Sequence, residues 1–241
     1  MKKHLLLAAA STFPAHAAVV SWNYDDTGTV SGTNAAGVVL VANWNNSFPT
    51  NPTINLIDST GTATTLDLAY GSFNNFHIQG SHPGVDGDGS YNKELLNGYL
   101  NAGPAAWSPA VTSSFVTLSQ IPYANYDVIV YFSSDGAGRE GQVNDGTTTY
   151  YFNTIGAPST AGANATLTQT TSTTTANYAT ANYAVFTGLT GSTRTFTVQM
   201  RDNDEWAGIA GFQVVSVPEP ASAALGSLAL IGLTLRRRRM D

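Results

Sequence analysis

The sequence predicts an all-β fold, a single β-sandwich of jelly-roll type with one short helix. Apolar and polar residues alternate along several short segments, most clearly over residues 195–201, where Phe196, Val198 and Met200 share one face. Polar turns that contain glycine separate these segments. A single stretch, residues 92–100, has apolar side chains at helical spacing. About ten strands over roughly 200 residues fit one sandwich.

The central strand is expected over residues 126–132, because this run is apolar on both faces. Asp145-Gly146 lies between two strand-like runs and predicts a tight hairpin turn. Residues 166–180 are rich in threonine and nearly free of apolar side chains, which predicts either a long loop or a polar edge strand, with hydroxyls that suit O-glycosylation. The other strands are expected over residues 19–24, 38–44, 53–58, 65–70, 115–118, 148–153, 183–187 and 209–215.

The composition excludes several classes of function. Charged residues make up 11% of the chain, against about 25% in ordinary soluble proteins. There is no cysteine, which excludes disulfides, thiolate metal sites and a cysteine nucleophile. The body, residues 18–216, holds four basic residues against fourteen acidic ones. Its net charge of −10 repels phosphate backbones, so nucleic acid is not an expected partner.

The N-terminus has the pattern of a signal peptide. Lys2 and Lys3 precede a short apolar run over residues 5–10, and Ala15-His16-Ala17 is a small-x-small cleavage site. We therefore expect a signal peptide over residues 1–17, cleaved between Ala17 and Ala18, and an exported body.

The C-terminus has the pattern of a marginal membrane span. Residues 221–235 form a continuous apolar run, shorter than the roughly 20 residues that a spanning helix needs. Four arginines at 236–239 follow it, and their long side chains extend the effective span and hold that end in the cytoplasm. The pattern predicts a transmembrane helix with the body on the outer side.

These terminal elements resemble a known sorting signal. Val217, Pro218, Glu219 and Pro220 are followed by the apolar run and then by Arg236, Arg237, Arg238 and Arg239. This order resembles the PEP-CTERM sorting signal of Gram-negative bacteria and covers residues 217–241. The resemblance implies processing by an exosortase, an integral-membrane enzyme, near Pro-Glu-Pro. It also implies a precursor anchored transiently in the inner membrane and a mature form at the cell surface or in the exopolysaccharide matrix.

The body resembles galactose-binding-like jelly rolls of bacterial surface proteins. The resemblance lies in residues 95–100, 115–118 and 126–132 and in the closing segment 206–215. It implies a β-sandwich of that type.

The loop before the closing segment is the first candidate site. Carboxylates and an amide can bond sugar hydroxyls while an indole ring packs on the C–H face of a sugar. The carboxylates also suit glycoside hydrolysis, which needs two of them about 5–9.5 Å apart. A third interpretation is a solvated acidic turn with a buried tryptophan. The residues are Asp202, Asn203, Asp204, Glu205 and Trp206.

A second candidate site has oxygen ligands at every second position, which suits a hard cation such as Ca²⁺. It lacks the glycine and glutamate positions of an EF-hand. The alternative is a Gly/Asp turn whose carboxylates bond their own backbone. The residues are Asp86, Asp88, Ser90 and Asn92.

The sequence contains no Gly-x-Ser-x-Gly motif and no glycine-rich phosphate loop. It therefore predicts a non-catalytic, exported protein that binds polysaccharide, with no cofactor other than the Ca²⁺ considered above. Two alternatives stay open: a secreted glycan hydrolase or lyase, and a purely structural matrix protein.

Overall fold

The computed structural model describes residues 17–24, 30, 32–46, 50–78, 84–103, 113–157, 165–201 and 206–218. The body, Ala18–Val217, is one compact unit, separate from the two ends of the chain. Its described part is nearly all β and contains two sheets, so the predicted fold class is confirmed at that level. The expected signal peptide, up to residue 16, and residues 219–241 lie outside the described residues.

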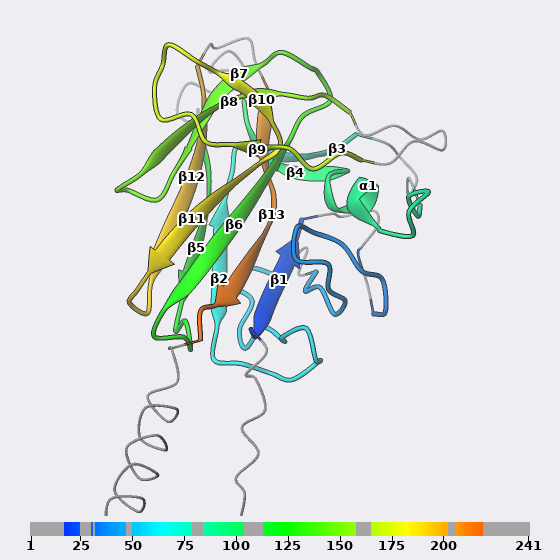
Figure 1. The fold of residues 1–241 in the computed structure, drawn as a ribbon, viewed down its shortest axis with the longest axis vertical. Coiled ribbons are helices and arrows are strands. Elements are labelled where there is room, and N and C mark those ends of the chain that lie inside the picture. Colours follow the sequence, from blue (N-terminus) through cyan, green and yellow to red (C-terminus); the bar gives the residue numbers. More distant parts are fainter. Residues whose placement is uncertain are drawn as a thin grey trace, which may run out of the picture. The chain divides into compact units, whose positions relative to one another are not determined.

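The larger sheet has seven strands in the order β3-β4-β13-β6-β11-β9, with β1 also paired to β13 (Figure 1). Along β13, residues 207–209 pair with β4 and residues 211–215 pair with β1. All pairs are antiparallel except β9 with β11. The strands are β1 (Val19–Asn23), β3 (Asn74–His77), β4 (Gly98–Ala102), β6 (Tyr126–Ser133), β9 (Gln169–Thr170), β11 (Tyr183–Leu189) and β13 (Ala207–Ser216).

The smaller sheet has six strands in the order β10-β8-β7-β12-β5-β2. Here β8 and β10 are parallel and the other pairs are antiparallel. The strands are β2 (Asp67–Gly71), β5 (Ser113–Ser119), β7 (Glu140–Asn144), β8 (Thr149–Thr154), β10 (Ala179–Ala181) and β12 (Arg194–Met200).

The two sheets share one hydrophobic cluster. Val130, Phe132 and Phe212 come from the larger sheet, and Phe152 and Phe196 come from the smaller one. The rings of Phe132 and Phe152 stack at 3.9 Å between centroids. Successive residues of a strand point to opposite faces of the sheet. Every second residue of a strand therefore points into this cluster, and the residues between them lie on the outer face.

A second cluster covers the outer face of the larger sheet. Residues 32–46 and the helix α1 (Asn92–Leu95) lie beside each other, since the Tyr91 N–H donates to Ala35 O at 2.8 Å (Figure 1). Trp44 and Leu95 are members of this cluster, together with Tyr131 of β6. The outer face is therefore largely buried although it is not part of the inter-sheet core.

Three predictions are wrong. Residues 38–44 and 53–58 form turns with isolated bridges instead of strands. Trp44 and Leu56 are buried, but Val38, Leu40 and Ile54 are exposed, so the apolar residues of these segments do not mark one buried strand face. Helix α1 confirms the short helix, but residues 98–102 form β4. Leu100 packs in the inter-sheet core and Tyr99 packs in the outer cluster. Because this strand is buried on both faces, its neighbouring apolar residues gave the spacing that was interpreted as a helix.

Two local predictions are confirmed. Asp145-Gly146 connects β7 to β8 in an antiparallel hairpin, and Gly146 has a φ of 85°. The Asp145 carboxylate accepts the N–H of Thr148 at 2.7 Å, which stabilises the turn. Within residues 166–180 both alternatives hold in part: residues 169–170 and 179–180 belong to the edge strands β9 and β10, and residues 166–168 and 171–178 form no strand.

Candidate functional site

Only part of the predicted sugar-binding loop can be placed. Asp202, Asn203, Asp204 and Glu205 lie outside the described residues. Trp206 precedes β13, and its side chain is partly exposed instead of fully buried. It lines a hollow with a volume of about 210 Å³, called here the Trp206 hollow. The lining residues are Asn74, Phe76, Tyr99, Asn101, Asp135 and Trp206.

The floor of the Trp206 hollow consists of two cross-strand pairs. Asn74 lies opposite Asn101, and Phe76 lies opposite Tyr99, in the register of β3 and β4. The Asn101 amide donates to the Asn74 Oδ1 at 2.9 Å, and the two rings lie 5.6 Å apart. Residues 99 and 101 alternate with the core residues 100 and 102, so both pairs face outward.

Trp206 is held in place beside this floor. A Cβ on Gly103 would lie 2.1 Å from the indole ring, so only glycine allows this approach. The Trp206 carbonyl accepts hydrogen bonds from Ser134 Oγ at 2.7 Å and from Arg139 Nη1 at 2.6 Å. The ring is thus positioned by its own backbone and by its contact with Gly103.

Asp135 provides the carboxylate of the hollow. It forms an ion pair with Arg139 at 2.6 Å and accepts a hydrogen bond from the Tyr99 hydroxyl at 3.4 Å. Burial, and then the charge of Asp135, raise the pKa of Tyr99 well above its usual value. The Tyr99 hydroxyl therefore stays protonated and keeps its role as a donor.

Asn101 has an unmet acceptor. Its side chain belongs to a residue only 3% exposed, and its Oδ1 accepts no hydrogen bond from the described residues. A buried polar atom without a partner costs about 1–3 kcal/mol. The Oδ1 atom has almost no exposed surface, so a ligand hydroxyl group would reach it only after the Asn101 side chain turns towards the hollow.

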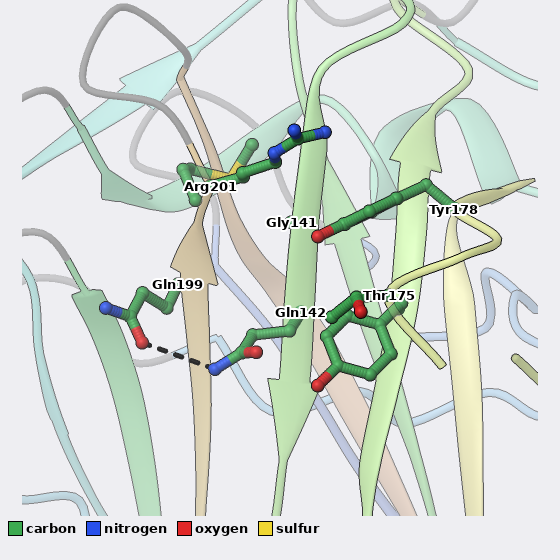
Figure 2. A pocket seen from close by; sticks show the side chains of 8 residues that line it. Gly141, Gln142, Thr175, Tyr178, Gln199 and Arg201 are labelled. Atoms are coloured by element: carbon green, nitrogen blue, oxygen red, sulfur yellow. Dashed lines mark hydrogen bonds between the residues drawn. The ribbon is translucent and has the colours of Figure 1, made fainter. Parts of the chain in front are cut away.

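A second hollow of about 200 Å³ lies on the smaller sheet and is called here the Tyr178 hollow. Gln142 of β7 donates to Gln199 of β12 at 3.3 Å, as Figure 2 shows. Its lining includes the side chains of Gln142, Tyr151, Thr175, Tyr178, Gln199 and Arg201.

The predicted calcium ligands have other partners in the structure. The Asp86 carboxylate accepts the N–H groups of Lys93 at 3.0 Å and of Ala165 at 2.6 Å. Asn92 Oδ1 accepts the Gly37 N–H at 2.8 Å, and Asp88 accepts that of Ser90 at 2.9 Å. These contacts favour the turn interpretation, and no group of three metal-binding side chains occurs in the described part. A Ca²⁺ site at Asp86, Asp88, Ser90 and Asn92 stays a prediction.

Sequence analysis identified one described residue of the Trp206 hollow, Trp206 itself. Asn74, Phe76, Tyr99 and Asn101 were missed because β3 and β4 were not predicted as strands, and Asp135 was missed because it lies in the loop after β6. Asn74 and Asn101 carry no local signal, since their pairing depends on the register between two strands.

Comparison with known families identifies the C-terminus. Residues 216–239 match the PEP-CTERM protein-sorting motif, which confirms the predicted signal. The motif marks an exported protein that carries a C-terminal membrane anchor before an exosortase processes it. Of Val217, Pro218, Glu219 and Pro220, the structure describes the first two.

No curated protein and no solved structure matches the chain. The resemblance to galactose-binding-like jelly rolls therefore stays a prediction. No helix in the described part is long and apolar enough to cross a membrane, and the expected span, residues 221–235, lies outside that part.

Proposed function

We propose that the chain is a non-catalytic protein of the cell surface or exopolysaccharide matrix that binds a neutral glycan in the Trp206 hollow. The sorting motif supports the destination. The observation that carries the binding function is the outward-facing set of amide and aromatic pairs beside a partly exposed tryptophan. The shared inter-sheet cluster supports a single β-sandwich of jelly-roll type as the scaffold.

The lining chemistry suits a neutral sugar. Amide and carboxylate groups bond hydroxyls, and the rings of Phe76 and Trp206 offer apolar faces to sugar C–H groups. The charge of Asp135 is compensated by Arg139, and the net charge of −10 on the body repels a negatively charged uronate. A turn of the Asn101 side chain towards the hollow would let its unmet acceptor bond a sugar hydroxyl.

Two alternatives are less well supported. Glycoside hydrolysis needs a pair of carboxylates, and the described lining of the hollow includes one, Asp135. A hydrolase or lyase would therefore draw on Asp202, Asp204 or Glu205. A purely structural role makes no use of the Trp206 hollow.

Trp206→Ala is expected to weaken glycan binding at least about tenfold, because it removes the largest apolar face of the hollow. The full chain, purified in detergent, would be titrated by calorimetry with neutral tetrasaccharides of glucose, galactose, mannose and N-acetylglucosamine. Phe115→Ala is the matched control, since Phe115 is an exposed aromatic residue outside both hollows. If the unchanged chain binds none of the four, the proposed function is wrong.

Asn101→Leu is expected to abolish binding in the Trp206 hollow while changing the free energy of unfolding by less than about 1 kcal/mol. The substitution loses one hydrogen bond to Asn74 but also removes an unmet buried acceptor, and these effects oppose each other. Urea unfolding followed by tryptophan fluorescence measures the stability. A loss above about 2 kcal/mol with binding retained would show that the amide is structural.

A further inference from the structure

We propose that the Tyr178 hollow is a second glycan-binding site, so that one chain can hold two glycan strands. This inference rests on the proposed function of the Trp206 hollow.

The two hollows repeat the same chemistry on different sheets. In the Trp206 hollow an amide pair, Asn74 and Asn101, lies beside an aromatic pair 5.6 Å apart. In the Tyr178 hollow an amide pair is formed by Gln142 and Gln199, and Tyr151 and Tyr178 are also 5.6 Å apart. The same combination of amide hydrogen-bonding groups and ring faces favours the same class of ligand, a neutral sugar.

The two sites open on the outer faces of the two sheets. Gln142 and Gln199 alternate along their strands with Val143 and Val198, which belong to the inter-sheet core. In the same way, the floor of the Trp206 hollow alternates with core residues of β4. The core therefore lies between the two sites, and one sugar ring cannot fill both.

The threonine-rich segment forms a wall of the Tyr178 hollow. It contributes Thr175 and Tyr178 to the lining, and both are labelled in Figure 2. The segment is tied to β8, because the Tyr151 N–H donates to Ser172 O at 2.8 Å and the Thr170 hydroxyl donates to Tyr151 O at 2.6 Å. These bonds on both sides of one tyrosine hold the wall against the sheet.

Arg201 positions the second ring. Its guanidinium lies 5.4 Å from the centre of the Tyr178 ring, within cation–π range, and forms an ion pair with Glu140. The ring is thereby fixed at one side of the hollow, which lowers the entropy that a ligand must overcome. Two ordered sites on one chain let the protein cross-link polysaccharide strands and gain avidity.

Calorimetry with the four tetrasaccharides tests the number of sites. We expect two equivalents of at least one tetrasaccharide per full chain, one equivalent for Trp206→Ala, one for Tyr178→Ala, and none for the double variant. Gln142→Ala serves as a second variant of the Tyr178 hollow if Tyr178→Ala does not fold, and Phe115→Ala should keep both equivalents.

Cross-linking provides an independent measurement. A soluble polymer of the sugar that binds should give rising light scattering with the unchanged chain, and either single variant should remove that rise while still binding. If one equivalent binds and Trp206→Ala abolishes it, the second site is refuted and the proposed function stands. If one equivalent binds and only Tyr178→Ala abolishes it, the assignment to the Trp206 hollow is wrong. Absence of all binding refutes both.

Discussion

Replacing Pro218, Glu219 and Pro220 together by alanine is expected to lower the mature surface form at least about tenfold. Proline disfavours a helix and favours an extended chain, so the two prolines are expected to keep the approach to the expected membrane span extended. Glu219 places a single carboxylate between them. Alanine removes the conformational restriction of the prolines and the carboxylate of Glu219. An exosortase would then meet a flexible, uncharged peptide in place of its recognition sequence. The unprocessed precursor is then expected to accumulate in the inner membrane.

Cell fractionation with an antibody to the body measures this outcome, and mass spectrometry of the C-terminus shows whether processing took place. Ser222→Ala is the matched control, because it changes the matched region outside Pro-Glu-Pro. Mature protein at the parental level after the triple replacement would mean that Pro-Glu-Pro is not what the sorting machinery recognises.

Phe132→Ala is expected to lower the free energy of unfolding by about 3–5 kcal/mol. The side chain is fully buried and stacks on Phe152 across the inter-sheet cluster, so its removal leaves a cavity touching both sheets. Phe115→Ala, at a side chain 40% exposed, should cost less than about 1 kcal/mol. Urea unfolding of the full chain in detergent, followed by tryptophan fluorescence, gives both values.

The same experiment tests whether the two sheets form a single sandwich. Combining Phe132→Ala with Phe152→Ala should cost less than the two separate losses added together, since both residues line one cavity. One cooperative transition is expected for every variant. Additive losses, or two separate transitions, would mean that the sheets unfold as independent units.

Sequence alone was enough where the signal is local. The Asp145-Gly146 turn is set by residues next to each other in the chain, and Gly146 takes the positive φ that its neighbours disfavour. The sorting signal is also linear, because an enzyme recognises it as a peptide segment. The alternation of Phe196, Val198 and Met200 predicted β12 correctly. This signal is also local, because side chains alternate between the two faces of a strand whichever strand it pairs with.

The tertiary structure decided what depends on register between distant strands. Residues 98–102 had helical spacing, and only pairing with β3 and β13 makes them a strand buried on both faces. Asn74 and Asn101 are 27 positions apart in the sequence and are hydrogen-bonded in the fold. They line the same hollow as Trp206 only because β4 pairs with β13. The signal that directs the sorting of this protein therefore lies in contiguous residues. Its candidate binding sites arise only when the sheets form, because a hollow requires side chains that the chain itself keeps far apart.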